Sequence, residues 1–303
     1  MILPPNLMQG DTIGIVSTAR KITETELKPF LSLLKEWKLQ PLLGKTIGAS
    51  DHQFAGSDAL RTQDFQEMID NPKVKAVWCA RGGYGTVRMV DKLDFSKFIQ
   101  NPKWIIGYSD VTVLHNTFQN LGIASLHAQM GLEIEKKTFE TQQSIYNVLF
   151  GNEHTIQIPS EEPLNRLGTA TGVLVGGNLS VLYSLMGSAS AIDTKGKILF
   201  LEDLDEYLYH IDRMTQNLKR NGYFTNLKGL IVGGMTQMND NSIPFGATAN
   251  KIIYDAVKEY DFPVCFHFPA GHILDNRALV MGAKTKLNVR EKNVTLSFIE
   301  KHD

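Results

Sequence analysis

The sequence predicts an α/β protein of two domains with mostly parallel sheets. From residue 12 onward, short apolar runs alternate with amphipathic segments, which is typical of βαβ units. The alternation stops between residues 151 and 169, where polar residues and two prolines indicate a linker, and then it restarts. We therefore expect an N-terminal domain over residues 1–160 and a smaller C-terminal domain over residues 161–303.

In the first domain, buried strands are expected where apolar runs are short, and helices where apolar residues recur every three or four positions. The expected strands cover residues 12–17, 74–80 and 104–108, with a further apolar stretch at 123–128. The expected helices cover residues 23–38, 59–70, about 110–121 and 138–150. The first of these helices begins behind Thr23, a residue type that commonly caps helices.

The second domain shows the same alternation and then closes with strands. Its expected strands cover residues 170–177, 197–203 and 227–235, and its expected helices cover 178–187, 207–220 and 247–260. The tail instead alternates with period two over residues 278–290 and 293–300, which predicts two closing β-strands.

Composition excludes several classes of protein. The chain has 303 residues, of which 43% are hydrophobic and 21% charged, as in a globular protein. Its net charge is −1 and it has no basic block, so we do not expect it to bind nucleic acid. No long apolar run predicts a membrane span, and the N-terminus lacks a secretory pattern, so we expect a cytoplasmic protein. Cys79 and Cys265 lie in apolar runs, where we expect buried thiols. No cluster of metal-ligand residues occurs, so no metal or cofactor is expected.

Ser109 is the candidate nucleophile. It follows the apolar run 104–108 and directly precedes a helical pattern, as a serine does on a nucleophile elbow. The backbone N–H of Asp110 would then face a developing oxyanion. The alternative is a simple helix cap at Ser109 or Asp110, and Val111 stands where the usual elbow motif has glycine.

Glu202 and His272 are the candidate acid and base. Glu202 ends a buried strand, although Asp203, Asp205 and Glu206 compete with it. His272 lies in a loop after an apolar strand. His127 is a rival base, and His267 is expected to be a packed core residue.

The glycine loop Arg81–Gly85 follows another strand. Its glycines allow close approach of a ligand, so Gly83 or Gly82 is expected to supply a second oxyanion N–H. Arg81, Gly82 and Tyr84 are the expected substrate-binding residues, and a plain tight turn is the alternative. The order Ser, Glu, His along the chain is the order that α/β-hydrolases use.

Six segments carry a resemblance to a known family. They are PPNLMQGDTIGIVS, ARGGYG, GYSD, GVLVGGNLSVL, LFLEDLDE and GHILDN, in this order along the chain. In them the sequence resembles the LD-carboxypeptidase family of serine peptidases, which also includes the microcin C immunity peptidases. The resemblance implies a flavodoxin-like or amidotransferase-like N-terminal domain that carries the nucleophile. It also implies a C-terminal domain that supplies Glu and His across a cleft.

The resemblance implies a function and assigns its residues. Ser109 becomes the nucleophile, Glu202 the acid, His272 the base, and Gly83 and Asp110 the oxyanion donors. The implied reaction needs no cofactor and releases the terminal D-alanine from murein tetrapeptides during cell-wall recycling, in a cytoplasmic homodimer. The chain departs from the family at residues 16–18, at Arg277 and at 279–282, none of which touches the triad.

Three other functions stay open at this point. The same triad is compatible with hydrolysis of peptidyl-nucleotide or aminoacyl-nucleotide amides, as in the immunity peptidases. The chain is also compatible with an inactive module that binds small molecules, or with a thiol enzyme that uses Cys79.

The residue that binds the terminal carboxylate of the substrate also stays open. Arg81 is the expected residue, and Arg213 and Arg277 are its rivals.

Overall fold

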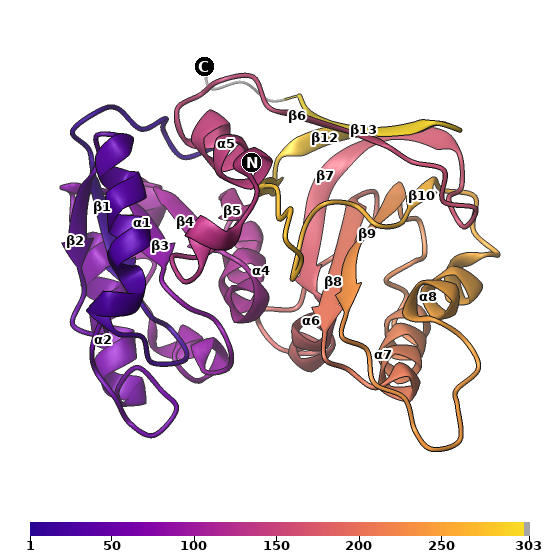
Figure 1. Ribbon diagram of the computed structural model, residues 1–303, viewed down its shortest axis with the longest axis horizontal. Coiled ribbons are helices and arrows are strands. Elements are labelled where there is room, and N and C mark those ends of the chain that lie inside the picture. Colours follow the sequence, from indigo (N-terminus) through magenta and orange to yellow (C-terminus); the bar gives the residue numbers. More distant parts are fainter. Residues whose placement is uncertain (300–303) are drawn as a thin grey trace.

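The computed structural model describes residues 1–299, which form two lobes with one β-sheet each (Figure 1). The sheet of the N-terminal lobe has the strand order β11-β5-β4-β3-β1-β2. These strands are β1 (Thr12–Val16), β2 (Gln40–Leu43), β3 (Val74–Cys79), β4 (Trp104–Gly107), β5 (Ser125–His127) and β11 (Leu279–Met281). The first five are parallel, whereas β11 comes from the far end of the chain and pairs antiparallel with β5.

Helices cover both faces of this sheet. They are α1 (Glu24–Glu36), α2 (Asp58–Asp70), α3 (Ser96–Gln100), α4 (Thr112–Asn120) and α5 (Phe139–Leu149). Side chains of α1 and α5 share one buried apolar cluster with the sheet, and those of α2, α3 and α4 share another. Successive strand residues point to opposite faces, so Trp78 lies in the first cluster and Val77 in the second.

The C-terminal lobe contains a mixed sheet in the order β10-β9-β8-β7-β12-β13-β6. Its strands are β6 (Thr155–Pro159), β7 (Gly168–Asn178), β8 (Ile198–Leu204), β9 (Gly229–Thr236), β10 (Val264–Cys265), β12 (Lys284–Val289) and β13 (Asn293–Phe298). The strands β7 to β10 are parallel, and β12, β13 and β6 add to β7 in antiparallel fashion.

One face of this second sheet carries the helices α6 (Leu179–Leu185), α7 (Leu208–Arg220) and α8 (Ala249–Val257) (Figure 1). The opposite face forms a separate cluster that includes Leu279 and Met281 of β11. The two lobes are therefore joined through shared packing as well as through the chain. Where they meet, α4 of the N-terminal lobe packs against β7 and α6 of the C-terminal lobe.

The α/β class, the parallel N-terminal sheet and the closing strands are confirmed. Two strands were not expected, namely β2 and β6, and the apolar strand expected before His272 is present as the two-residue strand β10. A division at residue 160 separates β6 from the sheet in which it pairs, so the strand pairing favours a division before Thr155. The expected strand 278–290 is two strands, of which β11 belongs to the other lobe. Residue 300, the last of the expected strand 293–300, lies outside the described residues.

Candidate active site

Ser109 lies on a strained turn between a buried strand and a helix. β4 ends at Gly107, and Ser109 begins the short 3₁₀-helix η3 (Ser109–Val111), which leads into α4. The φ angle of Ser109 is +63°, in the left-handed region that non-glycine residues seldom adopt. Backbone outliers of this kind cluster at functional sites, and a serine raised on such a turn is typical of a nucleophile.

The glycine loop after β3 lies against this turn. A Cβ atom on Gly82 would lie 3.4 Å from the Cβ of Ser109, so the two backbones are close neighbours. The next residue, Gly83, has φ +113°. At the far end of the loop, the N–H of Thr86 donates to Oδ2 of buried Asp110 at 2.8 Å, which fixes the loop to the turn. The two residues expected to supply oxyanion N–H groups are thus close in sequence to this contact, since Asp110 follows Ser109 and Gly83 follows Gly82.

Glu202 and His272 form a hydrogen-bonded pair. Nδ1 of His272 donates to Oε2 of Glu202 at 2.7 Å, and the backbone N–H of His272 donates to the same oxygen at 3.1 Å. The ring of Tyr108, the neighbour of Ser109, lies 4.7 Å from the imidazole ring of His272. No described residue bonds to Nε2 of His272. An imidazole oriented in this way can take a proton from a serine hydroxyl.

The environment sets complementary charge states for this pair. Burial pushes the pKa of His272 down, but the charge and hydrogen bond of Glu202 outweigh it, so this pKa lies above its ordinary value. Burial alone would raise the pKa of Glu202, yet its interactions with His272, His127 and Asn178 hold that pKa below its ordinary value. The carboxylate therefore stays ionised and stabilises an imidazolium.

Asn178 joins Glu202 to its neighbour Asp203. Its Nδ2 lies 3.3 Å from Oε1 of Glu202 and 2.9 Å from Oδ1 of Asp203. Strand alternation predicts that Glu202 and Asp203 cannot both orient His272. Both carboxylates contact the amide of Asn178, next to an irregular register of β8 against β9 between Leu201 and Asp203.

Only Glu202 is bonded to the histidine. Asp203 instead accepts the N–H of Ser180 at 2.9 Å, in the first turn of α6. The other rivals lie apart: Glu206 pairs with His210 at 2.6 Å, and Asp205 accepts from Asn239 at 2.8 Å.

Two further residues that sequence patterns did not indicate hold the loop that carries His272. Oδ1 of buried Asn276 accepts the N–H of Gly271 at 2.8 Å, and its Nδ2 lies 3.3 Å from Oε1 of Gln129. Gln129 follows β5 of the N-terminal lobe, so this contact links the two lobes beside the histidine. The signal that could have found Asn178 is its position at a strand end, the same kind of position that identifies Ser109. No comparable signal marks Asn276 or Gln129.

The rival histidines have other surroundings. His127 is completely buried in β5, its ring centroid lies 5.0 Å from that of Phe200, and burial lowers its pKa to about 4. A histidine in this state is a poor general base for an exposed serine. His267 is not a packed core residue as expected. The strand β10 ends at Cys265, and the exposed His267 ring contacts Asn250 at 3.0 Å and Glu162 at 3.1 Å.

The expected substrate-binding residues lie around the glycine loop. Arg81 donates to the carbonyl of Lys21 at 3.0 Å and lies 3.9 Å from Glu26. The Tyr84 ring is exposed and lies 6.2 Å from Phe54.

The rival arginines have partners elsewhere. Arg277 is bonded to Asp275, with the shortest distance 2.9 Å, and Arg213 stacks on the ring of Tyr209 at 5.1 Å.

Other chemistry finds little support in the described residues. Cys79 is completely buried, and burial raises its pKa to about 12, so it offers neither an exposed thiol nor a thiolate. No group of three histidine, cysteine or acidic side chains within residues 1–299 is placed to hold a metal ion. Over the same residues, no helix combines the length and apolar character that crossing a membrane requires.

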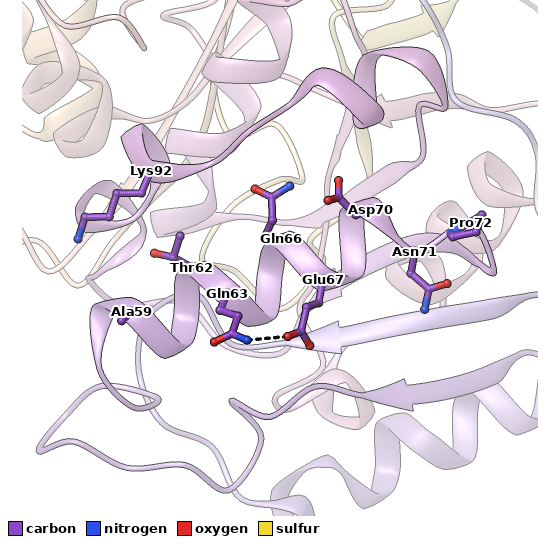
Figure 2. A pocket seen from close by; sticks show the side chains of 9 residues that line it. All are labelled: Ala59, Thr62, Gln63, Gln66, Glu67, Asp70, Asn71, Pro72 and Lys92. Atoms are coloured by element: carbon purple, nitrogen blue, oxygen red, sulfur yellow. Dashed lines mark hydrogen bonds between the residues drawn. The ribbon is translucent and has the colours of Figure 1, made fainter.

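A hollow lies along α2, apart from the candidate catalytic residues (Figure 2). Polar side chains line most of it, and Gln63 donates to Glu67 there at 2.9 Å (Figure 2). It contains no histidine and none of the residues discussed above.

Comparison with known proteins gives a consistent result. Residues 13–128 match the model of the LD-carboxypeptidase N-terminal domain, and residues 171–287 match that of its C-terminal domain. A probable murein peptide carboxypeptidase of Bacillus subtilis is 35% identical over 97% of this chain and 93% of its own length. The microcin C7 self-immunity protein MccF of Escherichia coli is 26% identical over 98% of this chain and 96% of its own length.

A solved structure has the same fold. The muramoyltetrapeptide carboxypeptidase from Oxalobacter formigenes aligns with a TM-score of 0.88 and 25% identity, over 96% of this chain and 100% of its own.

Proposed function

Because this chain belongs to the LD-carboxypeptidase family, we propose that it releases the terminal D-alanine from murein tetrapeptides. Ser109 acts as nucleophile, His272 as general base and acid, and Glu202 as the carboxylate that orients His272. The observation that carries this proposal is the 2.7 Å bond between Glu202 and His272, beside a serine at φ +63°. The names of similar proteins support the choice of a murein peptide as substrate.

The reaction follows from the roles of these side chains. His272 takes the hydroxyl proton of Ser109 on Nε2 while the serine Oγ attacks the carbonyl carbon of the diamino acid. The N–H groups of Gly83 and Asp110 stabilise the resulting oxyanion. The bond to D-alanine then breaks as His272 gives its proton to the leaving nitrogen. Water, deprotonated by the same imidazole, hydrolyses the acyl-enzyme and restores Ser109.

Substitution of the nucleophile tests the proposal. Ser109→Ala should lower kcat for release of D-alanine by at least about a thousandfold, because nucleophile and base act as a unit. Wild-type protein, but not the variant, should react covalently with a fluorophosphonate at residue 109. Thermal melts of both proteins check that the fold is intact. A variant that keeps more than about a tenth of the wild-type rate would contradict the assignment.

The similarity to the self-immunity protein MccF favours a second candidate function. The same triad could hydrolyse an amide in a peptidyl-nucleotide or aminoacyl-nucleotide. We therefore propose to assay purified protein against murein tetrapeptides, tripeptides and an aminoacyl-sulfamoyl adenylate in parallel. Turnover of the adenylate alone would select the second function, and turnover of none would favour an inactive binding module.

We also propose that the protein is a homodimer in the cytoplasm, as expected from the family. Light scattering coupled to gel filtration measures the first property. Fractionation of cells that express the full-length protein measures the second.

A further inference from the structure

Lys137 lies beside the loop that carries the catalytic histidine. It is the residue between the short helix η4 (Ile134–Lys136) and Thr138, which caps α5. Its Nζ donates to the carbonyl of Ile273 at 2.7 Å, and Ile273 directly follows His272. Thr138 also contacts this loop, through a 3.0 Å bond to Asp275. The ammonium group is thus held next to His272 by the N-terminal lobe.

This ammonium group has no acidic partner among residues 1–299, since no carboxylate lies within 4.0 Å of it. The nearby charge of Glu133 acts to raise the pKa of Lys137, but the Glu133 carboxylate pairs with Lys136 at 2.7 Å. Asp275, in the adjoining loop, pairs with Arg277 at 2.9 Å.

An unpaired cation in this position has a cost. The side chain is half-buried, and burial lowers the pKa of Lys137 because removal from water destabilises the charged form. Its positive charge also acts to lower the pKa of His272, so it opposes formation of the imidazolium. Both effects would be relieved by an anion bound at the ammonium group.

The proposed reaction brings an anion to this place. His272 must protonate the leaving nitrogen, so the departing D-alanine lies next to the imidazole, and its carboxylate is only one carbon away from that nitrogen. On the basis of the proposed function, we infer that Lys137 binds the terminal carboxylate of the substrate. The two remaining N–H donors of its ammonium group supply charge-assisted hydrogen bonds to that carboxylate.

Two arginines are the alternatives, and both lie on the glycine-loop side of Ser109. Arg81 already donates to the carbonyl of Lys21 and faces Glu26. The side chain of Arg20 runs over Gly83, where a Cβ atom would lie 2.6 Å from its Cδ. Both therefore adjoin the loop expected to bind the oxyanion, whereas Lys137 adjoins the group that protonates the leaving amine.

The test compares a tetrapeptide that ends in D-alanine with the same peptide ending in D-alaninamide. Lys137→Gln should lower kcat/KM for the acid by about ten- to a hundredfold, mainly through KM, and change that for the amide by less than about threefold. Lys137→Arg should retain most of the preference for the acid. Lys136→Gln is the matched control, because it removes an adjacent exposed lysine, and it should leave both substrates unaffected. Amide cleavage is followed with enzyme in excess, so that slow turnover is measurable.

A second readout separates binding from a structural role. Loss of the Lys137 charge should move the acid limb of the kcat/KM profile for the amide to higher pH, because the pKa of His272 is released upward. Equal losses on acid and amide, or a larger acid-specific loss in Arg20→Ala or Arg81→Ala, would overturn the inference. Failure of wild-type protein to cleave either peptide would instead count against the proposed function itself.

Discussion

Glu202 and Asp203 are adjacent carboxylates that the protein holds in different states. Glu202 faces His272 and has a lowered pKa, whereas burial and the charge of Glu202 raise the pKa of Asp203 to about 7. One amide, that of Asn178, contacts both. Near neutral pH, the site therefore combines one ionised acid with one that is partly protonated, and it limits the repulsion between two buried charges.

The pH dependence of the reaction should report the Glu202–His272 pair. His272 must be neutral to accept the serine proton, so kcat/KM should rise with pH through a pKa above the ordinary 6.5. Besides burial, this pKa responds to Glu202 and Asp203, which raise it, and to Lys137, which lowers it. Glu202→Gln removes the largest raising influence. We expect the acid limb to move to lower pH and kcat to fall by about a hundredfold or more.

Asp203→Asn is the matched comparison. Oδ1 of Asp203 accepts from Asn178 and Leu204, and Oδ2 accepts from Ser180. An asparagine has only one acceptor oxygen, so at least one of these donors loses its acceptor. The expected result is a loss of stability of about 1–3 kcal/mol with kcat reduced less than in Glu202→Gln. A larger catalytic loss at residue 203 than at 202 would reverse the two roles.

At the scale of single residues, the sequence predicts the candidate catalytic residues better than the residues that hold them in place. Ser109, Glu202 and His272 stand at strand ends or in the loop beyond one, where sites form in α/β sheets, so their position makes them candidates and the family resemblance chooses them over their rivals. Asn178, Asn276 and Gln129 act through hydrogen bonds between segments as far apart as 147 residues. No local pattern encodes such a contact. The same is true of Lys137, whose partner Ile273 lies 136 residues away.

Among the elements, the loop that carries His272 leaves no room for a side chain at Gly271. Gly271 has φ +103°, and a Cβ atom there would lie 2.6 Å from Oε2 of Glu202, the oxygen that binds the imidazole. Only glycine combines this backbone conformation with that approach. The loop and the end of β8 therefore fit together as one unit.

Gly271→Ala should lower kcat by about a hundredfold or more, because the methyl group displaces Glu202 from His272. Gly196→Ala is the control, since Gly196 also has positive φ, +72°, but a Cβ atom there meets no atom within 4 Å. The control should lose about 1 kcal/mol of stability and keep its activity. Equal activity losses in both variants would attribute the effect to backbone strain rather than to displaced Glu202.

The elements that the sequence predicts are those with a strong apolar pattern. β1, β3, β4 and β8 are buried on both faces and read as continuous apolar runs. β2 was missed because most of its residues are exposed. The apolar strand expected before His272 is shorter than its apolar run, because β10 has only two residues. β6 is an edge strand within a polar segment, where its pairing with β13 decides its conformation. Such strands depend on tertiary contacts that local preference does not show.

For the whole molecule, β11 couples the lobes, in addition to the packing of α4 against β7 and α6. It lies at the edge of the N-terminal sheet, yet Leu279 and Met281 pack in the apolar cluster of the C-terminal sheet. Val280, between them, packs in the N-terminal cluster. One short strand therefore contributes to two cores, because its successive side chains point to opposite faces. Neither lobe can lose its packing without exposing part of the other.

This coupling predicts one cooperative unfolding transition, and the tryptophans allow a direct test. The three tryptophans, Trp37, Trp78 and Trp104, all pack in one apolar cluster on the sheet of the N-terminal lobe, so their fluorescence reports the packing of that cluster. Leu218 is completely buried in the C-terminal lobe, in the cluster under α7. Leu218→Ala should cost about 2–5 kcal/mol through the cavity it leaves.

With coupled lobes, the fluorescence midpoint in urea should fall in Leu218→Ala together with the midpoint from circular dichroism, although no tryptophan is near the substitution. The exposed pair Lys136 and Glu133 provides a control, since Lys136→Gln should move neither midpoint by a measurable amount. If the lobes unfold independently, circular dichroism would show an early transition while the fluorescence midpoint stays at its wild-type value. The proposed catalytic residues come from both lobes, so a coupled transition also means that Ser109 and the Glu202–His272 pair lose their arrangement together, and activity should disappear along the same urea curve.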